Sequence, residues 1–404
     1  MQQALKNYLV VTGGYWAFTL TDGAIRMLVV LYFHTLGYSP FEVAMLFLFY
    51  EFFGIVTNLV GGWLGARFGL NRTMHLGMLL QVGALLMLTV PDAWLSVLYV
   101  MLAQALSGIA KDLNKMSAKA SVKQFSTEDN QQGLFKWVAI LTGSKNTLKG
   151  VGFFLGAGLL EWLGFRDALY TLAGSLAIVM LVTVLLLPSE VGKMVAKPKF
   201  TQVFSQIPSI NWLASARFFL FGARDVWFVV GLPVYLYEVL KWPFSQVGVF
   251  LALWVIAYGF VQASAPKLLK NRFAGAESGG LATLWAFLLT VITALLPVAL
   301  ASTESPMWVL IIGLAIFGVV FAVNSAIHSY LILAYSDADK VAMNVGFYYM
   351  ANAGGRLAGT VLSGAMYQLY GLEGCLWAAV AFLLMASLLS LKLPRKALQA
   401  ASGS

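Results

Sequence analysis

The sequence is poor in the residues from which catalytic and metal centres are most often built. Its single cysteine, Cys375, excludes an intramolecular disulfide and any cysteine-based metal site. The three histidines, His34, His75 and His328, lie too far apart for a metal-ligand spacing. There is no Ser/His/Asp constellation, no H-E-x-x-H motif and no appended soluble domain. The sequence therefore argues against an enzyme or a membrane-embedded sensor, and we expect no cofactor and no metal.

Charge is also scarce, and apolar residues fill its place. Charged residues make up 11% of the chain and hydrophobic residues 60%, with a mean hydropathy of +0.81. This composition is typical of a polytopic membrane protein rather than of a soluble domain of 404 residues. The net charge of +9 could suggest a nucleic-acid partner, but the basic residues occupy short loops between apolar stretches. Membrane topology explains that pattern, so we expect a lipid bilayer and no nucleic acid.

The apolar stretches predict an all-α membrane protein with twelve spans. A span needs about 20 apolar residues. Loop lysines and arginines fall almost entirely on one side, and the other side has only Arg166 and Lys241. The positive-inside rule then places both termini in the cytoplasm. The expected helices cover 8–33, 41–64, 73–91, 94–117, 133–160, 168–188, 211–237, 246–267, 278–299, 306–331, 341–369 and 373–392.

The two halves of the chain resemble each other. A polar connection, 189–210, separates six expected helices in 1–188 from six in 211–392, and 393–404 is an expected disordered tail. LGYSPFEVAMLFL (36–48) matches LKWPFSQVGVFLAL (240–253), and Asp22 then falls within one residue of Asp225. An offset of 207 pairs Lys149 with Arg356 and Gly152 with Gly359. Two six-helix repeats of this kind indicate a major facilitator, with its site at the repeat interface near mid-membrane.

Charged residues at membrane depth point to an anionic cargo. A charge at the centre of a membrane helix costs roughly 2.5–3.5 kcal/mol on insertion scales, so such residues are expected to line a wet interior. Basic residues outnumber acidic ones two to one. The bases are Arg26, Lys111, Lys115, Lys145, Lys149, Arg217, Arg224 and Arg356, and the acids are Asp22, Glu51, Asp112 and Asp225.

Helix 133–160 carries the best-placed basic pair. Lys145 and Lys149 are four residues apart and share a helix face. Two such charges repel in low dielectric unless an anion neutralises them, although both could instead snorkel to an interface. The glycines that follow, Gly150 to Gly158, would let a neighbouring helix approach closely. The residues expected to bind substrate are Arg26, Lys111, Lys115, Lys145, Lys149, Arg224, Tyr348, Asn352 and Arg356.

Tyr348, Asn352 and Arg356 belong to a polar stripe at i, i+4 spacing in 341–369, and arginine suits tetrahedral oxyanions because its guanidinium donates as a bidentate fork. Lys111 and Lys115 begin a ladder in which Lys119 and Lys123 are expected to be solvated. The adjacent residues Arg224 and Asp225 should face different directions, so that only one points at a cavity.

Three acids, Asp22, Glu51 and Asp225, are candidates for proton coupling. Each also has a structural interpretation. Asp22 precedes Arg26 by four residues, which favours an intrahelical pair, and Glu51 is a lone acid in its apolar stretch. Arg217 is expected to be an interfacial anchor, with a functional role left open. His328 is expected to be a satisfied interior residue, although it could titrate near neutrality.

The segment GGWLGARFGLNR (61–72) resembles the facilitator signature G-x-x-x-D-R-x-G-R-R/K at Gly62, Arg67 and Gly69. The acidic position is Ala66 here, and Leu70 and Asn71 replace two bases, which weakens the gating ion pair that the signature usually supplies. A plain basic cytoplasmic turn is the alternative.

Longer blocks resemble one family within the facilitators. YWAFTLTDGAIRMLVVL, AQALSGIAKDLNKMSAK, KWVAILTGSKNTLKGVGFFLG and FLFGARDVWFV are similar to the organoarsenical efflux permeases of bacterial arsenic-resistance operons. The resemblance implies export of 1-arseno-3-phosphoglycerate across the bacterial inner membrane, with exchange for protons as the expected coupling. It also implies a functional partner, the glyceraldehyde-3-phosphate dehydrogenase that makes this ester when arsenate replaces phosphate.

The residues agree with that implication on two points. The cargo carries two oxyanions, and each half of the chain carries bases at membrane depth. Trivalent arsenic would need several thiolates, whereas the chain has one cysteine. We expect a monomeric carrier; a generic organophosphate or phosphate transporter of the same fold is the alternative.

Overall fold

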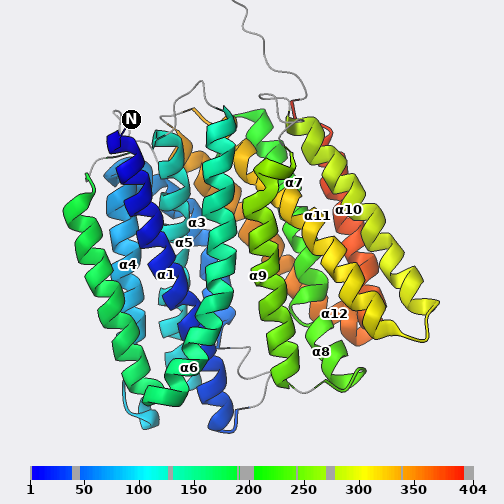
Figure 1. Cartoon of the computed structure of the whole chain (residues 1–404), viewed down its shortest axis with the longest axis horizontal. Helices are drawn as coiled ribbons and strands as arrows, with labels where there is room; N and C mark the ends of the chain where they lie inside the picture. The colour runs from blue at the N-terminus through cyan, green and yellow to red at the C-terminus, as the bar shows by residue number, and fades with distance from the viewer. Residues whose placement is uncertain are drawn as a thin grey trace, which may run out of the picture. The chain divides into compact units, whose positions relative to one another are not determined.

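The computed structural model describes residues 2–38, 46–125, 131–188, 191, 204–242, 244–269, 278–337 and 340–394. Within these ranges the regular structure is helical and contains no strand (Figure 1). The helices are α1 (Gln2–Thr35), α3 (Leu48–Phe68), α4 (Leu70–Met87), η1 (Asp92–Trp94), α5 (Val97–Phe125), α6 (Gln131–Leu186), α7 (Pro208–Phe228), α8 (Gly231–Glu238), α9 (Phe244–Leu268), α10 (Ser278–Ala301), α11 (Pro306–Ala334) and α12 (Val341–Ser390).

Two of the long helices bend sharply at a glycine. Gly164 in α6 has φ 77° and Gly371 in α12 has φ 64°, values that glycine adopts without steric cost. The bends fall in the gaps predicted between 133–160 and 168–188 and between 341–369 and 373–392. α6 and α12 therefore each consist of two helical segments joined by a tight turn. The predicted span 211–237 is also interrupted, because α7 ends at Phe228 and α8 begins at Gly231.

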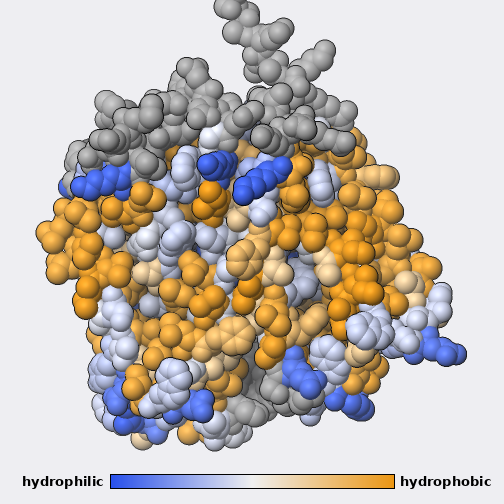
Figure 2. All heavy atoms as spheres, viewed as in Figure 1, coloured by the Kyte–Doolittle hydropathy of each residue, from blue (hydrophilic) through white to orange (hydrophobic). Residues whose placement is uncertain are grey.

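The helices carry the composition of membrane spans. Seven described helices are long and apolar enough to cross a bilayer, with α6 and α12 each counted once. On the face shown in Figure 2, apolar residues cover the middle of the helices and hydrophilic residues gather toward the helix ends. The chain is a multi-pass membrane protein, and the number of twelve spans stays a prediction.

The chain divides into two compact units. Unit 1 comprises Met1–Glu128, Ser144–Phe204 and Asp337–Met350, and unit 2 comprises Asp129–Gly143, Ser205–Ser336 and Ala351–Ser404. In unit 1, α1, α3 and α4 pack against α5; in unit 2, α7, α9 and α10 pack against α11. The division at 189–210 stays a prediction, and the segments 129–143 and 337–350 group differently from it. Residues 189–190 and 192–203 of that connection and the tail from 395 lie outside the described residues.

Within unit 1, α3 and the first part of α12 meet backbone to backbone. A Cβ atom added to Gly62 would lie 2.8 Å from the Ala342 carbonyl oxygen and 3.1 Å from the Gly346 Cα. We expect Gly62→Val to lower the stability of the purified protein by about 1–3 kcal/mol, the usual cost of overpacking. Thermal unfolding in detergent measures this. Gly174→Ala is the control, because a Cβ there meets no atom within 4 Å; an equal loss in both variants would contradict the contact.

Candidate functional site

Four helices of unit 1 bring acids and bases together in what we call the unit 1 cluster. A single tyrosine joins them. α1 supplies two charged residues, and α3 supplies one charged residue and the tyrosine. α5 supplies three charged residues, and α6 supplies one. The members are Asp22, Arg26, Tyr50, Glu51, Lys111, Asp112, Lys115 and Lys149.

Asp22 is the acidic residue of α1, and its side chain is 3% exposed. Its Oδ1 accepts a 2.5 Å hydrogen bond from the Tyr50 hydroxyl, and its Oδ2 lies 3.7 Å from Lys149 Nζ. Arg26 Nη2 lies 3.2 Å from Glu51 Oε1. Both residues of the predicted Asp22–Arg26 pair therefore bond to other helices, and the cluster ties α1 to α3 and α6.

Glu51 was expected to be a lone acid, and that expectation is wrong. Besides Arg26, its carboxylate has Lys111 Nζ at 4.0 Å, and its side chain is 28% exposed. Lys111 also lies 3.7 Å from Asp112, whose other oxygen is 2.5 Å from Lys115 Nζ. Glu51 and Asp112 are thus each held by two bases, because α5 presents Lys111 between them.

The cluster depends on glycines that let the helix backbones touch. A Cβ on Gly23 would lie 2.6 Å from the Lys149 carbonyl oxygen and 3.0 Å from the Gly152 Cα. A Cβ on Gly108 would lie 2.9 Å from the Tyr50 Cα. These crossings of α1 with α6 and of α3 with α5 set the charged side chains side by side. The close approach predicted for the glycines of 133–160 is observed at Gly152.

Unit 2 has a smaller ionic group of the same kind, the unit 2 cluster, formed by Arg224, Asp225 and Arg356. Asp225 is 1% exposed; its Oδ1 lies 2.5 Å from Arg224 Nη2 and its Oδ2 accepts a 3.0 Å hydrogen bond from Arg356 Nε. The expectation that Arg224 and Asp225 point apart is wrong, because the long arginine side chain folds back onto its neighbour.

A glycine crossing also builds the unit 2 cluster. A Cβ on Gly359 would lie 3.0 Å from the Asp225 Cβ and 3.1 Å from the Gly222 Cα, so α12 crosses α7 closely. The repeat aligned Lys149 with Arg356 and Gly152 with Gly359. In each unit the aligned base lies beside a buried acid, and the aligned glycine lies at a close helix crossing. Lys149 faces Asp22, and Arg356 faces Asp225.

The remaining predicted binding residues lie apart from these clusters or beside them. Lys145 is half-buried on α6. Tyr348 is fully buried in unit 1, whereas Asn352 belongs to unit 2 and accepts a 2.8 Å hydrogen bond from Arg217 Nε. Lys119 was expected to be solvated, yet it is 2% exposed and donates to the Tyr349 hydroxyl at 3.1 Å.

Two further expectations in unit 2 are wrong. Arg217 is not an interfacial anchor, because it is 3% exposed and packs 3.7 Å above the Phe221 ring. His328 is not satisfied: it is 1% exposed, and neither ring nitrogen has a hydrogen-bond partner among the described residues. Position along the span did not reveal that neighbouring helices cover Arg217, and the predicted interior position of His328 did not reveal that its ring nitrogens lack partners among the described residues.

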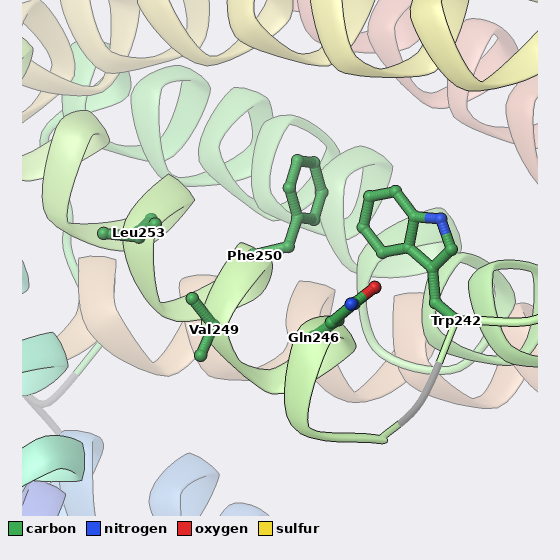
Figure 3. A pocket seen from close by; sticks show the side chains of 5 residues that line it. All are labelled: Trp242, Gln246, Val249, Phe250 and Leu253. Atoms are coloured by element: carbon green, nitrogen blue, oxygen red, sulfur yellow. The ribbon is translucent and has the colours of Figure 1, made fainter.

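The pocket drawn in Figure 3 holds none of the predicted charged residues. It has a volume of about 400 Å³ and lies along the start of α9, in unit 2. Its lining is apolar except for Gln246, and Val249 and Leu253 are more than two-fifths exposed. Such a surface depression suits an acyl chain better than an oxyanion.

A family model of the Major Facilitator Superfamily matches residues 11–293, which is more than half of the chain. The chain belongs to the Major Facilitator Superfamily. Solved facilitator structures are similar over nearly the whole chain, and a search of the curated proteins gives no match. The structural likeness, at low sequence identity, shows the fold alone.

Three of those structures show how far the likeness extends. A bacterial homologue of the iron transporter ferroportin, in an outward-facing state, has a TM-score of 0.75 and 14% identity, covering 96% of this chain and 98% of its own. The human organic anion transporter TETRAN has 0.76 and 15%, covering 96% and 99%. The proton:xylose symporter XylE has 0.74 and 12%, covering 97% and 96%.

As a facilitator, the chain is a transporter and not an enzyme. The segment resembling the facilitator signature joins α3 to α4 through Gly69, whose φ is 98°. Arg67 stacks its guanidinium 5.1 Å from the centre of the Trp63 ring. The turn is thus built by the matched glycine, and Ala66, at the acidic position, is fully buried.

Tyr50 belongs to the unit 1 cluster of this facilitator, but the sequence pattern did not mark it as a site residue. Its hydroxyl donates to Asp22, while Lys111 Nζ and Arg26 Cζ lie 3.8 Å and 4.5 Å from its ring centre. The ring face attracts both cations. In the run FLFYEFFG it looked like one more apolar aromatic residue.

We expect Tyr50→Phe to lower transport about tenfold, because it removes a hydrogen bond to a buried carboxylate worth about 1.5–3 kcal/mol and keeps the ring. Transport into everted vesicles, normalised to the folded protein, measures this. Tyr99→Phe is the matched control, since its hydroxyl donates to the Met87 carbonyl at 2.8 Å, away from the charges. Equal transport by both variants would remove Tyr50 from the mechanism.

Proposed function

We propose that this facilitator exports an anionic organoarsenical, 1-arseno-3-phosphoglycerate, in exchange for protons, and so confers resistance to arsenate. The observation that carries the proposal is the surplus of membrane-depth bases in each unit. Unit 1 has Arg26, Lys111, Lys115, Lys145 and Lys149 against Asp22, Glu51 and Asp112; unit 2 has Arg217, Arg224 and Arg356 against Asp225.

The arrangement of these charges suits exchange of partners. Each base named in the clusters already lies near a carboxylate, so an oxyanion that enters competes for cations held in place. Lys149 is 18% exposed and Arg356 29%, whereas their acids, Asp22 and Asp225, are at most 3% exposed. The cation is thus the more accessible member of each pair, and each unit by itself offers one to an oxyanion.

The fold does not select the cargo. The similar structures named above include, by their titles, an organic anion transporter and a proton:xylose symporter. Anions and sugars are therefore handled on one architecture, and the side chains of the site must decide between them. Arginine and lysine recognise phosphate and arsenate-type oxyanions by charge-assisted hydrogen bonds.

Proton coupling belongs to the same proposal. Glu51 is the most accessible of the three candidate acids, since its side chain is 28% exposed against 3% for Asp22 and 1% for Asp225. A proton arriving at Glu51 would release Arg26 and Lys111 from it. Protonation of Glu51 from outside, once the anion has left, would then help to reset the carrier, so that proton and anion alternate as exchange requires.

The resemblance to the organoarsenical efflux permeases also suggests the membrane and the partner of this carrier. We place the carrier in the bacterial inner membrane as a monomer, with glyceraldehyde-3-phosphate dehydrogenase as its functional partner. That enzyme would supply the ester inside the cell, where the bases of the clusters would collect it.

Everted membrane vesicles test the proposal. They are supplied with arsenate, glyceraldehyde 3-phosphate, NAD and the dehydrogenase, so that the ester forms beside the carrier, and arsenic uptake is followed. We expect uptake to need every component and to collapse with a protonophore. Uptake of arsenate alone, or none beyond control vesicles, would overturn the organoarsenical cargo.

A generic organophosphate or phosphate carrier is the second candidate, because the clusters bind oxyanions whatever their central atom. Competition distinguishes the two. Strong inhibition of uptake by glycerol 3-phosphate or by phosphate would favour the generic carrier; weak inhibition by both would favour the arsenoester.

A further inference from the structure

Helix α11 buries a polar face inside unit 2. Asn324, Ser325, His328 and Ser329 share this face at helical spacing, and each is at most 1% exposed. Among the described residues, no hydrogen-bond partner meets either side-chain atom of Asn324, either ring nitrogen of His328 or the Ser329 hydroxyl. Buried polar groups left unsatisfied cost stability, so an apolar helix retains them only when something else needs them.

Arg217 reaches this face from α7. Its Nη1 donates to the Ser325 hydroxyl at 3.2 Å and carbonyl at 3.4 Å, and its Nε donates to Asn352. Ser325 and Asn352 are neutral acceptors, so these bonds orient the guanidinium without cancelling its charge. The charge also lies within electrostatic range of His328.

Gln262 completes the group from α9. Its Nε2 donates to the same Ser325 hydroxyl at 3.1 Å, and its side chain is 1% exposed. Hydrogen bonds around Arg217 and Ser325 thus join α7, α9, α11 and α12 through guanidinium, amide and hydroxyl groups, and His328 lies one turn along α11. The group contains no carboxylate among its members, and donors of this kind match an anion rather than a cation.

We propose that Arg217, His328 and Asn324, supported by Gln262 and Asn352, form a second anion site inside unit 2. It takes one small oxyanion group, such as a phosphate, and is separate from the unit 2 cluster, where Asp225 already occupies two arginines. Its members are at most 6% exposed, so they must move apart for an anion to enter. The site rests on the proposed function in so far as the cargo is an anion.

The chain has three histidines, which allows a direct test. Full-length protein labelled with ¹⁵N-histidine is titrated with inorganic phosphate in detergent, and His328→Gln identifies the His328 signals. We expect a saturable shift of those ring nitrogens, while the other histidines stay still. Arg217→Gln should weaken the apparent affinity about tenfold, a loss of roughly 1.4 kcal/mol. Arg166→Gln, an exposed arginine paired with Asp92, should leave it unchanged.

A second variant keeps the test decisive if Arg217→Gln does not fold. Asn324→Leu replaces an unsatisfied amide by an apolar group of similar size, so its thermal midpoint should hold or rise. Its phosphate affinity should nevertheless fall about fivefold. Unmoved His328 signals at phosphate concentrations that saturate binding by calorimetry would show a purely structural cluster.

This outcome is independent of the vesicle experiment. A His328 shift without arsenic uptake would keep the site and overturn the cargo. Arsenic uptake with unmoved His328 signals would keep the cargo and overturn the site.

Discussion

Replacing Lys149 by alanine is expected to lower export by a factor of about 10 to 100 while the protein still folds. Its ammonium faces Asp22 at 3.7 Å, and charge-assisted contacts of this kind are worth about 1.5–3 kcal/mol. The variant leaves Asp22 with the Tyr50 hydroxyl and with Arg26 and Lys111 nearby, so the carboxylate keeps favourable surroundings. Transport in vesicles, divided by the amount of folded protein, measures the loss.

Lys136→Ala supplies the control, because Lys136 lies on the same helix and is exposed. It should transport at the wild-type rate. The double variant Asp22→Asn with Lys149→Gln should fold as well as the wild type and still fail to export, since it restores neutrality without a cation for the cargo. Lys145→Ala should lose export as Lys149→Ala does. Wild-type export by both Lys145→Ala and Lys149→Ala would exclude these two lysines from the path of the cargo.

Asp225→Asn is expected to lower the stability of the protein strongly. The carboxylate is 1% exposed and lies between Arg224 and Arg356, so its removal leaves two partly buried cations facing each other. Breaking a buried ionic group by removing one partner costs about 3–5 kcal/mol. The thermal midpoint in detergent and the yield of folded protein should both fall.

A second substitution separates stability from transport here. Asp225→Asn combined with Arg356→Gln removes one cation as well and should recover most of the stability without recovering export. Asp92→Asn is the matched control, since its pair with Arg166 is about half exposed on both sides and worth at most about 1 kcal/mol. If Asp225→Asn unfolds no earlier than Asp92→Asn, Asp225 does not hold the two arginines together.

Much of the architecture was predictable because it depends on local chemistry. Gly164 and Gly371 turn the chain where the predicted spans end, and the apolar stretches became helices. The charged residues at depth were expected to line a wet interior, and most of them pair with one another across helices. The interruption after Phe228 was not predicted, because Val229 and Val230 carry no turn signal.

Partner choice was beyond the sequence. Asp22 was matched with Arg26, four residues away, but helix crossings also gave it Tyr50 and Lys149, which lie on other helices. The crossing at Gly23 and Gly152 decides this, and a single sequence does not show which glycines meet. The same limit hid Arg217 and His328, whose roles depend on which neighbouring helices cover them.

The glycine crossings constrain how the charges can be released. At Gly23 with Gly152, and again at Gly222 with Gly359, main chain rests on main chain, so no side chain between them can change rotamer and let the helices slip. An acid and its base therefore travel as one block whenever these helices move. A rival ion or a proton can still separate the two charges. Under the proposed exchange, a carrier that holds neither cargo nor proton therefore keeps its ion pairs closed and does not cycle idly.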